Sequence, residues 1–180
     1  VQHLGDQSYG PYQWKSYSEV YHIASCVARG MAKMNLPAEQ EYKGSKLKLI
    51  GIYSKTKEEW LVTDIACWML SVANVPLYDT LGEETICWTF AQTLLSTIFL
   101  TSDGVPKLAS IMKKGKIKTL KNVVCFDEIT SEAKQVAHEV GLRVIKFDEL
   151  IALGEENRTM PLDFSGAESV ITICYTSGTT

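Results

Sequence analysis

The sequence predicts an α/β fold in which helices flank a layered, mainly parallel sheet. Two observations lead to this fold class. Short apolar segments rich in β-branched residues alternate with helix-length segments through residues 47–153, a pattern typical of βαβ crossovers between parallel strands. The chain has 180 residues, 46% of them hydrophobic, which is enough to bury a core of about one domain.

The leading segment, residues 1–46, contains one expected helix. In SYSE, Ser16 and Glu19 form a Ser-x-x-Glu capping box, in which each residue satisfies an unpaired backbone N–H of the other. Apolar residues then recur at helical spacing at Val20, Ile23, Ala24, Val27, Met31 and Met34. The spacing predicts an amphipathic helix over 17–34, closed by Pro37.

The alternation begins at residue 47. We expect strands at 47–54 (LKLIGIYS) and 75–78 (VPLY), and helices at 57–74 and up to about residue 93. The later half of the first of these helices is apolar nearly all round, so it must be covered on several sides. Thr80 and Glu83 form a second capping box before the next helix.

The second half continues the same alternation. We expect strands at 96–102, 120–126 and 143–147 and helices at 105–114 and 130–140, capped by Asp103 and ended by Gly141 respectively. The polar segment 154–168 contains two glycines and a proline and is expected to be a loop. It leads to a final strand at 169–176, whose apolar and β-branched residues predict burial.

Charge excludes one class of partner. The net charge of −3 gives none of the overall basic field that dominates nucleic-acid binding. Lysines gather locally at Lys113, Lys114, Lys116, Lys118 and Lys121. Such a group is typical of a solvated helix end, and the alternative is a patch for a membrane surface or an acidic partner.

Cysteine usage is that of a reducing compartment. The five cysteines, Cys26, Cys67, Cys87, Cys125 and Cys174, are odd in number and include no CxxC pair. With three histidines in the chain, this spacing predicts neither a disulfide framework nor a zinc site, and no residue is assigned as a metal ligand. No segment has the roughly 18 apolar residues of a membrane span, and no signal-peptide pattern is present. The first residue, Val1, is not an initiator methionine, and the sequence stops within a hydroxyl-rich stretch, so both ends are expected to be cut.

The last ten residues, ITICYTSGTT, carry the chemistry of the chain. Hydroxyls come from Thr176, Ser177, Thr179 and Thr180, and Gly178 permits the positive φ that turns successive N–H groups inward. Hydroxyls and converging amides suit phosphate oxygens, although a plain turn has a similar composition. The GxxxxGK[ST] and GxGxxG patterns are absent, so a common NTPase loop and a dinucleotide fingerprint are excluded.

The order of these residues resembles a known signature. YTSGTT at 175–180 is similar to the start of the phosphate-loop motif YTSGTTGxPKG of adenylate-forming enzymes. Upstream, YQWKSYSEV (12–20), IGIYSKTKEEWLVTDIACW (50–68) and VPLYDTLGEET (75–85) resemble eukaryotic long-chain fatty acyl-CoA synthetases. The resemblance covers almost the whole chain. YSKTKEEW departs from the asparagine and arginine that commonly precede Glu-Trp in that family, which puts no known catalytic role in doubt.

The resemblance implies part of the large N-terminal domain of a two-step ligase. Such an enzyme converts a long-chain fatty acid and ATP to an acyl-adenylate, then transfers the acyl group to coenzyme A, with Mg²⁺ neutralising the triphosphate. It implies ATP contacts at Thr176, Ser177, Gly178, Thr179 and Thr180. It assigns no catalytic residue, and it predicts that the chain alone is inactive. It also implies a cytoplasmic location or the cytosolic face of the endoplasmic reticulum, the mitochondrial outer membrane or the peroxisome. The alternatives are a non-catalytic binding module and a ligase for another carboxylic acid.

For several single residues the sequence predicts a structural role and not a catalytic one. Asp79 precedes Thr80 and is expected to orient the start of a helix, and Tyr175 is expected to pack under the loop. Aromatic residues expected in the core, rather than along an acyl tunnel, are Trp60, Trp68 and Trp88. No catalytic role is assigned to the histidines, His3, His22 and His138.

Overall fold

The structure is a computed structural model that describes residues 10–42 and 44–176. Its helices are α1 (Tyr17–Lys33), α2 (Glu58–Trp68), α3 (Glu83–Thr93), α4 (Val105–Lys113), α5 (Ser131–Glu139) and α6 (Phe147–Glu156). Its strands are β1 (Ala38–Tyr42), β2 (Ser45–Tyr53), β3 (Ala73–Leu77), β4 (Thr97–Leu100), β5 (Asn122–Cys125) and β6 (Arg143–Lys146).

The strands form one mixed sheet in which all pairs but one are parallel. The parallel part has the order β3-β2-β4-β5-β6, and β1 pairs antiparallel with the first half of β2. The chain therefore adds β3 on one side of β2 and β4 on the other, with Leu49 opposite Ala73 and Gly51 opposite Ile98. The predicted α/β class with a mainly parallel sheet is confirmed, and the strand order reverses between β2 and β4.

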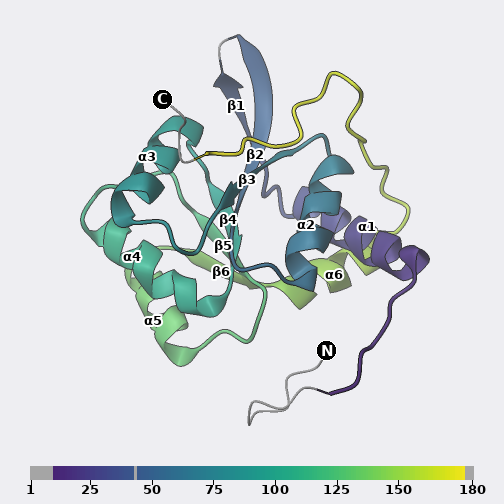
Figure 1. Ribbon diagram of the computed structural model, residues 1–180, viewed down its shortest axis with the longest axis horizontal. Coiled ribbons are helices and arrows are strands. Elements are labelled where there is room, and N and C mark those ends of the chain that lie inside the picture. The colour runs from purple at the N-terminus through teal and green to yellow at the C-terminus, as the bar shows by residue number, and fades with distance from the viewer. Residues whose placement is uncertain (1–9, 43, 177–180) are drawn as a thin grey trace.

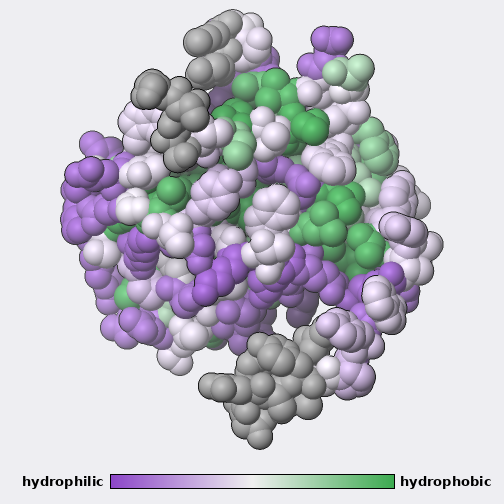
Figure 2. Space-filling model, in the orientation of Figure 1, coloured by the Kyte–Doolittle hydropathy of each residue, from purple (hydrophilic) through white to green (hydrophobic). Residues whose placement is uncertain are grey.

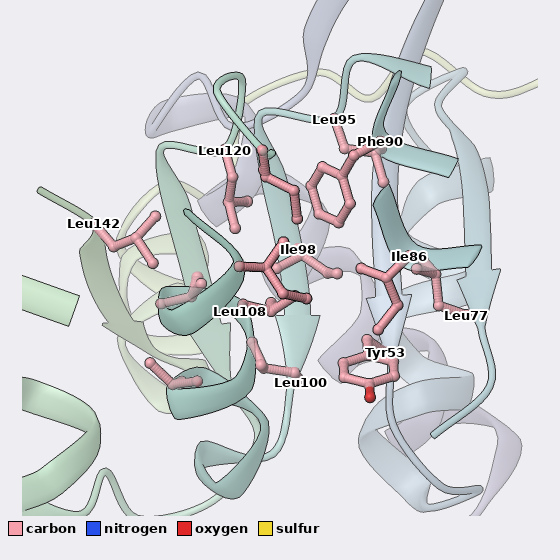
Figure 3. Close-up of a cluster of buried hydrophobic side chains, with 14 of the residues drawn as sticks. Tyr53, Leu77, Ile86, Phe90, Leu95, Ile98, Leu100, Leu108, Leu120 and Leu142 are labelled. Atoms are coloured by element: carbon pink, nitrogen blue, oxygen red, sulfur yellow. The ribbon is translucent and has the colours of Figure 1, made fainter. Parts of the chain in front are cut away.

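Helices cover both faces of the sheet. Figure 1 shows α3, α4 and α5 on one face and α1, α2 and α6 on the other. Side chains that alternate along a strand point to opposite faces, so Ile98 and Leu100 of β4 enter one core cluster whereas Phe99 enters the other. Figure 3 shows the first cluster, in which the ring of Tyr53 packs while its hydroxyl points out of the cluster.

The predicted first helix is confirmed as α1. Its capping box is complete: the backbone N–H of Glu19 donates to Ser16 Oγ over 3.2 Å, and that of Ser16 donates to Glu19 Oε2 over 2.6 Å. The helix buries the face that includes Ala24, Val27 and Met31 against α2 and α6. The helix predicted at 130–140 is α5, with Thr130 as its cap and Gly141 following at φ 72°.

Two helix boundaries were predicted wrongly in the first half. The helix expected over 57–74 ends at Trp68, and β3 begins at Ala73. The turn between them places Ser71 at φ 50°; because residues 72–75 are all buried, helical periodicity could not separate them from the helix. The second capping box is also wrong, since α3 begins after Gly82 without a side-chain cap.

Other predictions fail in the second half. Asp103 lies within a 3₁₀ turn (Ser102–Gly104) and does not cap α4, which begins after Gly104. The expected loop at 154–168 begins inside α6, because Phe147, Leu150 and Gly154 fall on one buried helical face. The expected buried strand at 169–176 is a single bridge between Thr172 and Asn74 and is largely exposed. β1 was not predicted because its sequence, AEQEY, is polar.

The surface lysines follow their prediction, and three of the five cysteines are buried, as expected. The gathered lysines are exposed at and beyond the end of α4. Lys114 and Lys116 contact Glu83 at 2.6 and 2.7 Å, and their hydrogen bonds lower the pKa of Glu83 to about 2. All five cysteines are unpaired, and Cys26, Cys67 and Cys125 are buried.

The tryptophans follow their prediction only in part. Trp60 packs half-buried against the core, whereas Trp68 and Trp88 are 38% and 52% exposed. The prediction that Trp68 and Trp88 pack in the core was therefore wrong, because the faces of α2 and α3 that carry them point away from the sheet. Within residues 10–42 and 44–176, no helix combines the length and apolar character needed to cross a lipid bilayer.

Candidate functional site

The structure describes one of the five residues predicted to bind ATP. Thr176 is the last described residue and is exposed. Ser177, Gly178, Thr179 and Thr180 lie outside the described residues. What the structure shows is therefore how the sheet holds the segment that leads into the predicted phosphate loop.

The segment 160–176 runs around the C-terminal end of α2 and then crosses the edge of the sheet at β3 (Figure 1). Two hydrogen bonds fix its first half to the turn after α2: Ser71 Oγ donates to the carbonyl of Asp163 over 2.9 Å, and the N–H of Ser165 donates to the carbonyl of Trp68 over 2.8 Å. The backbone of Asn74 fixes the second half, donating to Ile171 over 3.1 Å and accepting from Ile173 over 2.9 Å.

The side chain of Asn74 adds a third attachment. Asn74 is 2% exposed, and its Oδ1 accepts a hydrogen bond from Thr172 Oγ1 over 2.7 Å. Its amide nitrogen donates to a carboxylate oxygen of Asp64 on α2. Burial raises the pKa of Asp64, and a hydrogen bond from Trp68 opposes that shift. Strand, helix and segment are thus joined through one amide that uses both its donor and its acceptor.

Beyond Asn74 the segment reaches α3. The ring of Tyr175 meets Trp88 edge to face at 5.2 Å between centroids, and its hydroxyl donates to Gln92 Oε1 over 3.0 Å. The packing role predicted for Tyr175 is confirmed, since it also contacts the first core cluster. Thr176 therefore follows a ring that is held against α3.

A cleft of about 320 Å³ lies under this segment. It is lined by Gln40, Glu41, Leu47, Leu49, Gln92, Thr93, Leu94, Val170, Ile173 and Tyr175. Figure 2 shows an apolar area on this face of the molecule. In the segment itself, Val170 and Ile171 are 45% and 40% exposed. Apolar surface of this kind marks a place where another surface packs.

A second cleft, of about 530 Å³, lies at the opposite end of the sheet. It is lined by Tyr53, Ser54, Lys55, Lys57, Asp79, Thr101, Asp103, Gly104, Lys107 and Asp127. These residues lie at or beyond the carboxyl ends of β2, β3, β4 and β5, and Lys107 is on α4, around the point where the strand order reverses. Open α/β sheets bind ligands at such a point.

Lys107 organises this second cleft. Its Nζ donates to Tyr53 Oη over 2.7 Å and to the carbonyl of Leu81 over 2.8 Å. Tyr53 in turn donates to the carbonyl of Asp79 over 3.3 Å, which holds the ends of β2 and β3 together. Both acceptors of the ammonium are neutral, so its charge remains available to an anionic group.

The prediction that Asp79 orients the start of a helix was wrong. Asp79 does not start a helix, because α3 begins after Gly82; instead its carboxylate faces Lys55 at 3.9 Å across the cleft. Sequence reasoning did not connect Lys55, Asp79 and Lys107. The available signal was their position, since each follows the carboxyl end of a strand expected in a parallel sheet.

Taken together, the sheet and the segment define a doubly wound α/β domain whose C-terminal segment ends in a hydroxyl-rich sequence. The chain belongs to the family of AMP-binding enzymes, which matches residues 2–180.

Curated relatives of the chain are fatty acid ligases. It is 30% identical over 174 residues to long-chain-fatty-acid–CoA ligase 1 of Homo sapiens, covering 94% of this chain and 24% of that protein. It is 28% identical over 176 residues to fatty acyl-CoA synthetase B of Dictyostelium discoideum, with coverages of 95% and 24%. The chain thus spans about a quarter of the length of these relatives.

The fold has also been seen in solved structures. The A domain of a carboxylic acid reductase from Segniliparus rugosus, in complex with AMP and a co-purified carboxylic acid, superposes with a TM-score of 0.67. The two are 17% identical, over 89% of this chain and 25% of that one. At this identity the likeness concerns the fold alone.

Proposed function

We propose that this chain supplies the ATP phosphate-binding loop of a long-chain fatty acid–CoA ligase. One observation carries the proposal: YTSGTT stands at 175–180 of a chain that matches the AMP-binding family over residues 2–180. The names of the relatives, at about 30% identity, support the fatty acid as the substrate and coenzyme A as the acceptor.

In the proposed reaction the loop holds the leaving part of ATP. Hydroxyls of Thr176, Ser177, Thr179 and Thr180, with backbone N–H groups around Gly178, donate to oxygens of the β- and γ-phosphates. The fatty acid carboxylate attacks the α-phosphorus, pyrophosphate leaves, and the thiol of coenzyme A then displaces AMP from the acyl-adenylate. Positioning and charge stabilisation are the loop's contribution.

Magnesium would reach the site with the triphosphate and offset its charge. We assign no magnesium ligand within the chain. For the intact protein we propose a cytoplasmic location or the cytosolic face of an intracellular membrane.

The anchoring of the segment supports the role of the loop. A loop that grips phosphates must be held in place before ATP arrives, because ordering it during binding costs free energy. Asn74 and Tyr175 hold the preceding residues from two directions. Thr176 then directly follows Tyr175, whose ring is held against α3.

The test uses the full-length protein that contains this chain. With ATP, Mg²⁺, palmitate and coenzyme A, pyrophosphate release should depend on the acid, and replacing Thr176, Ser177, Thr179 and Thr180 by alanine should slow it by at least about 10²-fold. Thr159→Ala, an exposed threonine outside the loop, is the matched control and should keep full activity. Unchanged turnover in the loop variant would contradict the proposed role of the loop.

Two further arms separate the alternatives. Residues 1–180 alone should release no pyrophosphate, because they span about a quarter of the relatives' length. An acid panel distinguishes a long-chain ligase, which prefers palmitate, from a ligase for aromatic or short acids. If the full-length protein releases no pyrophosphate with any acid, a non-catalytic binding module is the better description.

A further inference from the structure

Three side chains capable of binding a metal meet where α1 and α6 pack together. Glu155 Oε2 lies 3.1 Å from His22 Nε2 and 3.1 Å from Cys26 Sγ. The sulfur and the imidazole nitrogen are 3.9 Å apart. Among the residues that the structure describes, this is the group of histidine, cysteine and acidic side chains whose ligand atoms all lie within 4.8 Å of one another.

Helix geometry brings these residues together. His22 and Cys26 are four residues apart on α1 and therefore lie on one face. Glu155 comes from α6, whose backbone approaches α1 very closely: a Cβ on Gly154 would collide with the carbonyl of Cys26, and one on Gly30 would collide with the carbonyl of Leu150. Because the two backbones touch at Gly154, the next residue is delivered directly over Cys26.

We propose that His22, Cys26 and Glu155 form a zinc site that links α1 to α6. Zinc in proteins takes this combination of imidazole, thiolate and carboxylate. Ligand atoms about 2.0–2.3 Å from one tetrahedral ion lie roughly 3.3–3.6 Å from each other. The three separations of 3.1, 3.1 and 3.9 Å bracket that range, so small side-chain adjustments complete the geometry.

The chemistry of the group favours zinc over harder ions. On binding, the Cys26 thiol releases its proton to solvent and His22 coordinates through an unprotonated Nε2. The resulting thiolate excludes Mg²⁺ and Ca²⁺, which prefer oxygen ligands. Thiolate and carboxylate together balance the charge of the dication.

The residues around the proposed site leave Glu155 Oε2 free to bind zinc and leave a route by which zinc can enter from solvent. The Arg158 guanidinium pairs with Glu155 Oε1, which leaves Oε2 facing Cys26 and His22. An outer-shell partner of this kind orients a ligating carboxylate. The side chains of His22 and Glu155 are 51% and 38% exposed, so zinc can enter from solvent and water can take the fourth position, while Cys26 remains buried.

The proposed zinc site would have a structural role that is separate from ATP binding and acyl transfer. It would tie α1, the first helix of the described chain, to α6, the last helix before the segment 160–176. A metal that binds the folded state alone stabilises it in proportion to the logarithm of its concentration once the site is saturated. Sequence spacing could not predict the site, because 129 residues separate Cys26 from Glu155.

The test is metal binding by the full-length protein after chelator treatment. Titration with Co²⁺ should give a saturable tetrahedral spectrum with a thiolate-to-cobalt charge-transfer band, and Zn²⁺ should displace the cobalt and raise the thermal midpoint. His22→Ala, Cys26→Ser and Glu155→Gln should each lose one metal equivalent, or weaken zinc binding beyond the roughly 10–100-fold lost when an outer-shell partner is removed. Glu156→Gln and His138→Ala, on exposed positions, are the matched controls and should retain binding.

The variants also separate binding from folding. Cys26 is buried, so Cys26→Ser could unfold the protein; His22 is exposed, and His22→Ala should leave the metal-free midpoint unchanged while removing the zinc-dependent rise. The proposal is overturned if no thiolate band develops, or if His22→Ala and Glu155→Gln bind as much zinc as the parent protein.

Discussion

Thr172 donates a hydrogen bond from its hydroxyl to the side-chain oxygen of Asn74 over 2.7 Å, joining the C-terminal segment to a buried position on β3. The same amide donates to Asp64 on α2. Two backbone hydrogen bonds of Asn74 flank this contact. One polar residue inside an apolar sheet therefore makes three of the contacts that hold the path toward the predicted phosphate loop.

We expect Asn74→Ala to loosen the segment, because it removes the side-chain attachment and keeps the two backbone hydrogen bonds. The substitution leaves Asp64 and Thr172 without their shared partner, which should lower the free energy of unfolding by about 1–3 kcal/mol. Trypsin should then cleave after Arg158 faster than in the parent protein. Urea denaturation and a proteolysis time course measure both effects.

Gln135→Ala, at an exposed amide on α5, is the control for Asn74→Ala and should change stability by no more than about 0.5 kcal/mol. If Asn74→Ala behaved like this control, the amide would not hold the segment.

Asp64 should make stability depend on pH. Burial raises its pKa above the ordinary 3.8, so the folded protein favours the protonated carboxyl, and stability falls as pH rises from 3.8 through the raised value. Asp64→Asn keeps an oxygen for Asn74 and removes the charge. Its stability relative to the parent should increase over that pH window and level off above it, as measured by denaturation at a series of pH values. A constant difference at every pH would argue against the raised pKa.

Gly154→Ala should be strongly destabilising. Its new Cβ would occupy the position of the Cys26 carbonyl on α1, and neither backbone can move without opening the helix pair, so we expect a loss of at least about 3 kcal/mol. Gly166→Ala is the matched control, because a Cβ there meets nothing within 4 Å. Thermal melts of the two variants compare them directly. Similar midpoints would mean that α1 and α6 do not pack backbone to backbone.

Thiol reactivity should follow burial. Cys174 is exposed, whereas Cys67 and Cys125 are buried; burial, followed by the nearby Asp127, raises the pKa of Cys125 to about 12. Since the thiolate is the reactive form, a thiol reagent at neutral pH should label Cys174 first and reach Cys67 and Cys125 only when denaturant is added. Mass spectrometry of digests identifies the labelled positions. Equal labelling rates at the three residues would contradict the described core.

Local patterns in the sequence were enough to predict much of the fold. The capping box at Ser16 and the apolar spacing after it predicted α1, and the alternation over 47–153 predicted the parallel sheet. These features depend on neighbours within a few residues, so the pattern carries them without help from the rest of the chain. YTSGTT likewise indicated the family through the order of six consecutive residues.

Contacts between distant residues decided what the sequence left open. The same apolar run became the end of α2 and the start of β3 because β3 pairs with β2. The strand-like residues 169–176 meet the edge strand β3 in a single bridge, between Thr172 and Asn74. The cleft of Lys55, Asp79 and Lys107 and the group of His22, Cys26 and Glu155 likewise assemble only when separate strands and helices meet. Local periodicity depends on nearby residues, whereas pairing partners and site geometry depend on which surfaces pack together, and that is settled only by the folded chain.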